Sequence, residues 1–115
     1  MEDLRASKLF QEVLVKTKAG RIQWEPTASE TEYFSILPDD FIVTVSSVPD
    51  TDSWGQDYQR QALVLRKNDQ ELLRVTPDVD GVGGQGLTEL YEFARRRALR
   101  VDAAVDKLLG ELAKL

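Results

Sequence analysis

The chain has 115 residues, 42% of them apolar and 30% charged, which is the size of one domain and the composition of a folded globular protein. It contains no cysteine and no histidine, which excludes disulfides, thiolate metal sites, the common zinc sites and catalysis by serine–histidine or cysteine–histidine pairs. The net charge of −5 disfavours a general nucleic-acid binder, because phosphate contacts require a basic surface.

The first ten residues, MEDLRASKLF, do not have the basic and then apolar segments of a signal peptide. No apolar run reaches the roughly 18 residues that a membrane-spanning helix needs. We therefore expect a cytoplasmic protein with one domain over residues 1–115 and no membrane contact.

Residues 2–18 have the spacing of an amphipathic helix. Residues that recur at intervals of three and four place one set on a common side: Ala6, Phe10, Val13, Leu14 and Thr17. Gly20 is expected to end this helix, as glycine commonly does just after a last helical turn. The next segment, RIQWEPT, is predicted to be extended up to Pro26, with Trp24 covering one edge of the core.

The centre of the chain predicts two β-hairpins. Segments 30–37 and 41–48 flank a proline-containing turn, and segments 58–67 and 70–76 flank Asn68-Asp69. The expected inward set of the second hairpin is Leu63, Leu65, Leu73 and Val75. A polar loop, residues 49–57, is expected between the hairpins. Together the segments predict a four-stranded antiparallel meander, for which RIQW is a candidate extension.

The C-terminal part carries the clearest periodic pattern in the chain. Apolar residues recur at intervals of three and four at Leu87, Leu90, Tyr91, Ala94, Ala98, Val101, Val105, Leu108, Leu109 and Leu112. A straight helix of this length would extend about 40 Å at about 1.5 Å per residue, so it either projects or breaks. Asp102 is the predicted break, as the cap of a second helix that begins at Ala103.

Residues 81–86 read GVGGQG, the G-x-G-x-x-G pattern of dinucleotide-binding loops. In that fold a second parallel strand follows the helix, whereas here the predicted helix continues to the end of the chain. Asp78 and Asp80 precede the glycines and would repel phosphates. We interpret the segment as a flexible connector between the last strand and the helix, and we predict no cofactor.

The stretch Asp50-Thr51-Asp52-Ser53-Trp54-Gly55 resembles the start of a calcium loop. The fifth position is Trp54, where Asp or Asn belongs, and the twelfth is Gln61, where a bidentate Glu belongs. A solvated acidic turn is the favoured interpretation, and weak calcium binding by Asp50, Asp52 and Asp57 is the alternative. The remaining carboxylates are scattered, so no catalytic residues and no metal site are predicted.

Two groups of side chains are candidates for binding a partner. Arg95, Arg96, Arg97 and Arg100 cluster in sequence and suit phosphate or an acidic partner, or else form a solvated face paired with Glu89, Glu92 and Asp102. Trp54 either folds back over the sheet or stays exposed as an anchor for a partner. The candidate partner-binding residues are thus Trp54, Arg96, Arg97 and Arg100.

The order of elements, with a helix before Trp24, a four-strand meander and the closing segment LTELYEFARRRALRVDAAVDKLLGEL, resembles small bacterial proteins of unassigned function. The resemblance implies an α+β fold and supplies no activity. From the residues themselves we also predict α+β, with an antiparallel four-stranded meander flanked by an N-terminal helix and a long or broken C-terminal helix.

The absence of a catalytic constellation favours a non-catalytic protein-interaction or regulatory module. Nucleic-acid or phospholigand binding through the Arg95 to Arg100 helix face is the alternative, and an enzyme that uses carboxylates with a metal has the least support. The sheet is too short to cover the end of the apolar stripe. We therefore expect a homodimer in which one set of residues packs against its copies or a neighbouring sheet, namely Val105, Leu108, Leu109 and Leu112. The alternative is a helix that folds back on its own core.

Overall fold

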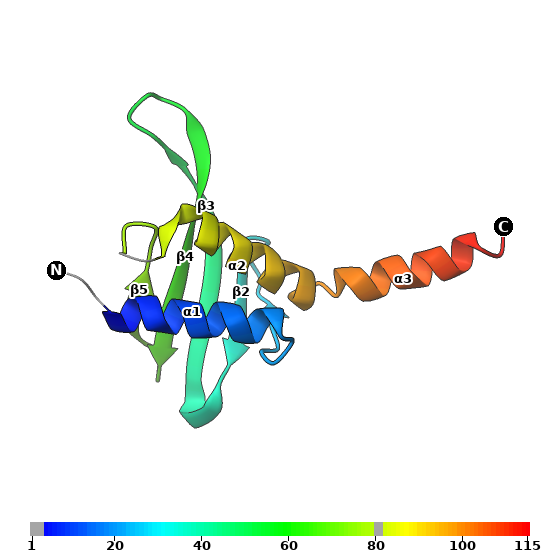
Figure 1. Ribbon diagram of the computed structural model, residues 1–115, viewed down its shortest axis with the longest axis horizontal. Helices are drawn as coiled ribbons and strands as arrows, with labels where there is room; N and C mark the ends of the chain where they lie inside the picture. The colour runs from blue at the N-terminus through cyan, green and yellow to red at the C-terminus, as the bar shows by residue number, and fades with distance from the viewer. Residues whose placement is uncertain (1–3, 80–81) are drawn as a thin grey trace.

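The computed structural model describes residues 4–79 and 82–115 and has an α+β architecture (Figure 1). An N-terminal helix precedes an antiparallel meander, and helical segments follow it, as the sequence predicts. The sheet has five strands in the order β1-β2-β3-β4-β5. They are β1 (Glu25–Pro26), β2 (Glu32–Ile36), β3 (Phe41–Thr51), β4 (Asp57–Lys67) and β5 (Gln70–Val75). The short edge strand β1 follows Trp24, so the fifth strand lies slightly later than RIQW.

Helix α1 (Leu4–Lys18) buries the five residues expected from its period. It ends as predicted at Gly20, whose φ is 74°. The Gly20 N–H donates to the Thr17 carbonyl at 3.0 Å, and the Arg21 N–H donates to the Lys16 carbonyl at 2.9 Å. This pair of bonds is the Schellman arrangement, which satisfies the last carbonyls of a helix and requires a left-handed residue at this position.

Both predicted hairpins are confirmed. The short 3₁₀ turn η1 (Pro38–Asp40) joins β2 to β3, and a two-residue turn joins β4 to β5. In that turn Asn68 and Asp69 have φ values of 54° and 65°, the positive values of a type I′ hairpin turn. Leu63 and Val75 are buried, and Leu65 and Leu73 pack partly buried against the core, as expected for the inward set.

The core lies between one face of the sheet and two helices, α1 and α2 (Gly83–Ala98), which lie over the same face (Figure 1). Trp24 is 2% exposed and donates from Nε1 to the Thr17 hydroxyl at 3.1 Å, which attaches β1 to α1. The rings of Tyr33 and Tyr91 lie 5.7 Å apart between β2 and α2. Lys18 and Glu89 form an ion pair between the helices.

Residues 83–86 of the glycine-rich segment belong to a helix, which corrects their interpretation as a flexible connector. Helix α2 begins at Gly83, four residues before the expected start, whereas Asp80 and Gly81 lie outside the described residues. A Cβ placed on Gly86 would lie 2.8 Å from Cζ of Phe10. Gly86 therefore permits close contact between α1 and α2, a packing role that the flanking sequence does not reveal.

The C-terminal pattern divides at Arg100, two residues before the predicted break. Arg100 has left-handed φ and ψ of 54° and 43°, and α3 (Val101–Leu112) follows it. Asp102 lies in the first turn of α3 and makes no cap, because Arg100 occupies that position. Helix α3 does not fold back on the core but projects from it, so the molecule measures 59 × 42 × 25 Å (Figure 1).

The loop between the hairpins is shorter than expected, a second correction, because four of the nine residues 49–57 belong to strands. Strands β3 and β4 pair from Phe41↔Lys67 to Thr51↔Asp57, which leaves only residues 52–56 as loop. This ribbon extends beyond the rest of the sheet (Figure 1). Among the described residues, no helix combines the length and the apolar content needed to cross a bilayer.

Candidate interaction surfaces

The first candidate surface is the α3 stripe, which consists of Val105, Leu108, Leu109 and Leu112. These side chains are 48–57% exposed, and none of the 12 residues of α3, all of them described, is buried. The four residues lie within two helical turns on one side, because intervals of three and four bring residues onto one helix face. An exposed apolar row of this kind is typical of a surface that binds a partner.

Two features of the α2–α3 junction direct the α3 stripe away from the core. Arg100 has a left-handed backbone, which costs a non-glycine residue about 1–2 kcal/mol. Across the junction Arg96 donates from Nη2 to the Asp102 carboxylate at 2.6 Å. Both side chains of this ion pair are more than half exposed, so it adds little stability, but it favours one angle between the helices.

The second candidate surface is the β3–β4 arm, residues 48–60. Strand β2 pairs with β3 only as far as Ser46, and β5 pairs with β4 only from Leu63, so the arm is a two-stranded ribbon. Trp54 lies in its loop and is 88% exposed, so it does not fold back over the sheet. An isolated ribbon is marginally stable in water, so its polar contacts matter.

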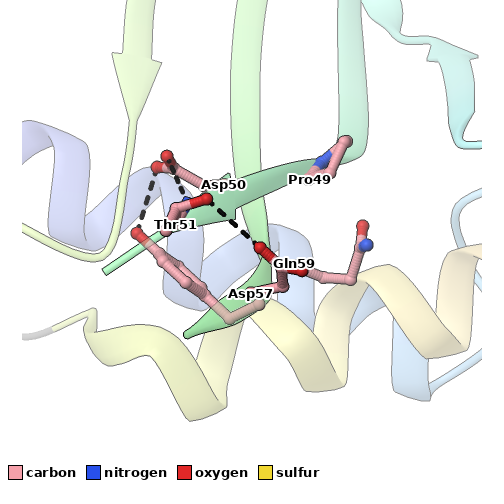
Figure 2. A pocket seen from close by; sticks show the side chains of 6 residues that line it. Pro49, Asp50, Thr51, Asp57 and Gln59 are labelled. Carbon is pink, nitrogen blue, oxygen red and sulfur yellow. Dashed lines mark hydrogen bonds between the residues drawn. The ribbon is translucent and has the colours of Figure 1, made fainter. Parts of the chain in front are cut away.

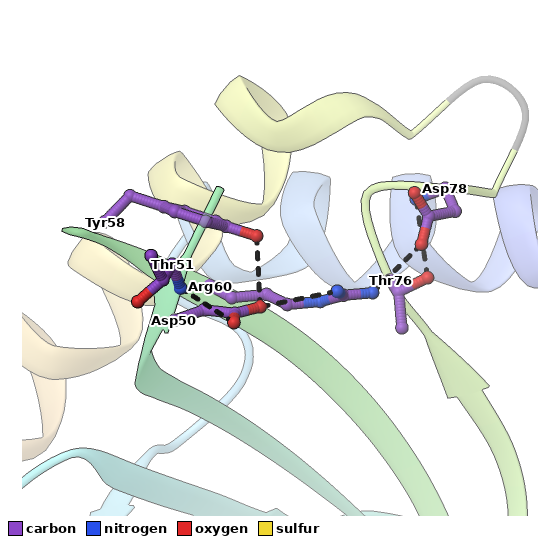
Figure 3. A network of polar contacts seen from close by, with 6 residues as sticks. All are labelled: Asp50, Thr51, Tyr58, Arg60, Thr76 and Asp78. Carbon is purple, nitrogen blue, oxygen red and sulfur yellow. Dashed lines mark hydrogen bonds and ion pairs between the residues drawn. The ribbon is translucent and has the colours of Figure 1, made fainter. Parts of the chain in front are cut away.

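Asp50 is the centre of the contacts that hold the arm (Figure 3). Its carboxylate accepts the Thr51 N–H at 2.8 Å and the Tyr58 hydroxyl at 3.0 Å, and Arg60 lies 3.7 Å away. The Thr51 N–H, then the Tyr58 hydroxyl, lower the pKa of Asp50 below its usual value. The hydrogen bond to Asp50 is also the main reason that the pKa of Tyr58 is raised.

Arg60 connects the arm to the segment between β5 and α2. Its Nη2 donates to the Asp78 carboxylate at 2.9 Å, while the Thr76 hydroxyl accepts the Asp78 N–H at 3.4 Å (Figure 3). Sequence reasoning did not identify this network. Residues 48–51, VPDT, and 57–60, DYQR, do not alternate between apolar and polar residues, so the sequence offers no periodic signal for the strands in the arm.

Buried polar side chains anchor the root of the arm to α2. Gln61 donates from Nε2 to the Ser47 hydroxyl at 3.1 Å, and its Oε1 lies 2.8 Å from the Thr88 hydroxyl. Ser47 in turn donates to Oε1 of Gln59 at 3.1 Å. Because Ser47 and Gln61 are buried, these bonds satisfy groups that would otherwise be costly to bury. The arm therefore emerges from a fixed base.

The aspartates of the arm are occupied by hydrogen bonds within the arm. Asp52 Oδ1 accepts the N–H groups of Trp54 and Gln56 at 2.8 and 2.9 Å, which shapes the turn. Asp57 accepts the Thr51 hydroxyl at 3.3 Å beside an open hollow of about 630 Å³ (Figure 2). Within the described chain no three acidic side chains form a group able to hold a metal ion.

The candidate arginines do not gather on one face. Arg95 lines a hollow of about 510 Å³ with Tyr91 and the loop after β1. Arg96 pairs with Asp102, and the Arg97 guanidinium lies 3.6 Å from the point that a Cβ of Gly20 would occupy. Neighbouring residues on an α-helix point about 100° apart, so consecutive arginines diverge. Arg100 lies beyond α2, at the junction.

The hollow beside Arg95 contains hydroxyl groups that are already engaged. The Tyr33 hydroxyl donates to the Glu30 carbonyl at 2.9 Å, and the Thr27 hydroxyl lies 3.0 Å from the Glu32 carbonyl. Burial is the main cause of the raised pKa of Tyr91. A raised pKa opposes formation of the Tyr91 phenolate.

Comparisons with protein-family models, curated proteins and solved structures found no match to the chain. The resemblance to small bacterial proteins therefore remains a prediction. Two elements project from the body of the molecule, α3 and the arm, and they carry the α3 stripe and Trp54 (Figure 1).

Proposed function

We propose that the protein is a non-catalytic protein-interaction module, in which the α3 stripe binds a partner and the arm adds a second contact through Trp54. The observation that carries the proposal is the outward direction of the α3 stripe. Val105, Leu108, Leu109 and Leu112 are about half exposed, although both leucines of α2 are buried. Burial of such side chains is worth roughly 1.5–3 kcal/mol each, which a partner would recover.

The arm supports the proposal because its contacts hold the backbone of an exposed aromatic residue, Trp54, in a defined turn. Asp52 shapes the loop that contains Trp54, and Asp50 and Arg60 connect the arm to the body. Large aromatic side chains frequently dominate binding energies at interfaces. A held Trp54 loses less conformational freedom on binding than one in a mobile loop would lose.

Affinity capture from a lysate of the source cells with the tagged full chain tests the proposal. A specific partner should be retained by the wild type and by Ala103→Glu, and lost with Leu108→Glu. Both variants add the same charge to α3, but Ala103 lies on the side opposite the stripe. Trp54→Ala should weaken capture, whereas the neighbouring change Ser53→Ala should not. Equal capture by Leu108→Glu and wild type would contradict the proposal.

Phospholigand binding through Arg95 to Arg100 has weaker support, because the arginines diverge and Arg96 is paired. Its test is the salt dependence of binding to a labelled oligonucleotide. A steep loss of affinity with added salt, flattened by Arg96→Ala with Arg100→Ala, would favour it over the interaction module.

A further inference from the structure

We infer that α3 pairs in an antiparallel arrangement with α3 of a second copy of this chain. The inference rests on the proposed function, because it names the partner of the same α3 stripe. It depends on three properties of α3, which are the spacing of its apolar residues, its short length and the distribution of its charges.

The apolar residues of α3 have the spacing of a helix-pairing seam. Val101, Val105, Leu108, Leu112 and Leu115 follow one another at intervals of 4, 3, 4 and 3 residues. This alternation places residues at the a and d positions of a heptad, where two helices interlock. Leu109 lies beside the seam and widens it. A stripe that contacts a sheet does not require this alternation, whereas a helix pair does.

An antiparallel register pairs each valine of the seam with a leucine. When Val101 lies opposite Leu112 of the partner subunit, Val105 lies opposite Leu108 of the partner subunit. The register aligns the full extent of α3, from Val101 to Leu112. Each layer then combines a smaller and a larger side chain, so that the helices approach evenly along their length.

The length of α3 creates a need for this partner. Isolated helices shorter than about 12–15 residues are marginal in water, and α3 has 12 residues, none of them buried. Its principal contact is with the adjoining end of α2. A second α3 gives both helices a buried side and so stabilises the helical conformation of each.

Charge favours the antiparallel direction. The first half of α3 contains Asp102 and Asp106 and has a charge of −2, whereas its second half, residues 107–112, contains Lys107 and Glu111 and has no net charge. An antiparallel pair brings each acidic half beside the neutral half of the partner, where Asp106 lies level with Lys107 of the partner subunit and Asp102 lies level with Glu111 of the partner subunit. A parallel pair would bring acidic halves together and would also align the helix dipoles unfavourably.

The other sheet face is a less suitable partner for the stripe. Alternation along β4 and β5 places Arg66 and Arg74 on the face away from the helices. There Glu71 lies 2.7 Å from Arg74 and 3.9 Å from Arg66. A leucine row over this face would remove charged groups from water at considerable cost. A lipid surface is also disfavoured, because interfacial helices carry basic polar faces whereas Asp102, Asp106 and Glu111 lie near the stripe.

The area that α3 offers sets the strength of the pair. Twelve residues extend about 18 Å at about 1.5 Å per residue. One side of so short a helix offers less area than the roughly 800 Å² that each partner buries in a standard interface. Monomer and dimer should therefore exchange with concentration. In sedimentation equilibrium of the purified full chain, the mean mass should rise from 13.0 kDa toward twice that value. Leu108→Glu should hold it at the monomer value, and Ala103→Glu should behave as wild type.

The antiparallel direction of the two α3 helices is tested by disulfide cross-linking, since the natural chain has no cysteine to interfere. We expect Val101→Cys and Leu112→Cys chains, carrying tags of different mass, to form a mixed disulfide under mild oxidation. Neither should form one with itself, because identical positions lie about 16 Å apart in the antiparallel register, beyond the roughly 7 Å that a disulfide spans. Ala103→Cys, on the far side, should give neither product. Self-linked Val101→Cys or Leu112→Cys would overturn the antiparallel direction.

The outcomes separate this inference from the proposed function. A 13.0 kDa species at every concentration overturns self-pairing. If Leu108→Glu still abolishes capture of another protein, the interaction module stands with a different partner. Flotation of the monomer with phosphatidylserine-containing vesicles would instead assign the stripe to lipid. If Leu108→Glu still self-associates and still captures a partner, both proposals are rejected.

Discussion

Helices α2 and α3 carry the same apolar period, but only one of them lies against the rest of the molecule. In α2 the stripe meets the sheet and α1, and Leu87, Leu90 and Ala94 are buried. In α3 the stripe continues with Val105, Leu108 and Leu112, which are exposed. The difference arises at Arg100, where a left-handed residue turns the chain beyond the edge of the sheet. Periodicity therefore identifies the side of a helix that can be buried, and tertiary contacts decide what covers it.

Truncation of one leucine in α2 and one in α3 should give the largest difference in the free energy of unfolding. Leu90→Ala leaves a cavity in the core and should lower the free energy of unfolding by about 2–5 kcal/mol. Leu108→Ala should change it by no more than about 0.5 kcal/mol, since that side chain is half exposed. Urea denaturation at a protein concentration where the chain is monomeric measures both. Similar costs would mean that α3 packs on the core in solution.

Glycine-to-alanine changes in the same two helices should have opposite signs. Gly86→Ala places a Cβ against Phe10 and should destabilise the fold by about 1–3 kcal/mol. Gly110→Ala meets no atom within 4 Å and should make α3 more helical, by up to about 1 kcal/mol. Thermal unfolding and far-UV circular dichroism report these effects. Phe10→Leu should recover part of the loss from Gly86→Ala, and additive losses would argue against the contact.

The ends of α1 and α2 offer a smaller test. Both helices end near a residue with positive φ, which is Gly20 for α1 and Arg100 for α2. Gly20→Ala should cost about 1 kcal/mol, because alanine resists this conformation. Arg100→Gly should relieve strain at the junction and gain less than about 1 kcal/mol, since glycine also loses more entropy on folding. If the urea midpoints of both variants moved in the same direction, the conclusion that Gly20 is unstrained and Arg100 is strained would be wrong.

Acid should weaken the contacts that hold the arm, with the smallest energetic consequence of these changes. The folded-state pKa of Asp50 is lowered, first by the Thr51 N–H and then by Tyr58. Its ionised form thus stabilises the arm above the ordinary value of 3.8, and this contribution is lost as the pH falls through the lowered value. Tyr58→Phe should raise the pKa of Asp50, as observed by NMR titration of its carboxyl carbon. An unchanged pKa would remove Tyr58 from the network.

The sequence predicted elements whose signals are local. The five buried residues of α1, the role of Gly20 and the Asn68-Asp69 turn follow from period and turn chemistry within a few residues. Residues 49–57 of the arm were predicted as a loop, because Pro49, Asp50 and Asp57 are typical of turns. The pairing that places these three residues in strands joins segments on either side of the loop. The role of Gly86 depends on Phe10, which is far away in the chain.

The position of the break between α2 and α3 could not be predicted from local sequence either. Asp102 has the chemistry of a helix cap, whereas Arg100 has no local preference for a left-handed backbone. The candidate site was predicted in part. The residues of the α3 stripe were named from the sequence, while the Asp50, Tyr58 and Arg60 network required the folded arm.

The two tryptophans give the protein a built-in optical readout. Trp24 is enclosed between α1 and the sheet, whereas Trp54 is in water. Their indole rings therefore emit from environments of opposite polarity. Unfolding should shift the emission of Trp24 to longer wavelengths, and contact at the arm should shift that of Trp54 to shorter ones. A Trp24→Phe or Trp54→Phe chain isolates each signal, so one spectrum can distinguish loss of the fold from occupation of the arm.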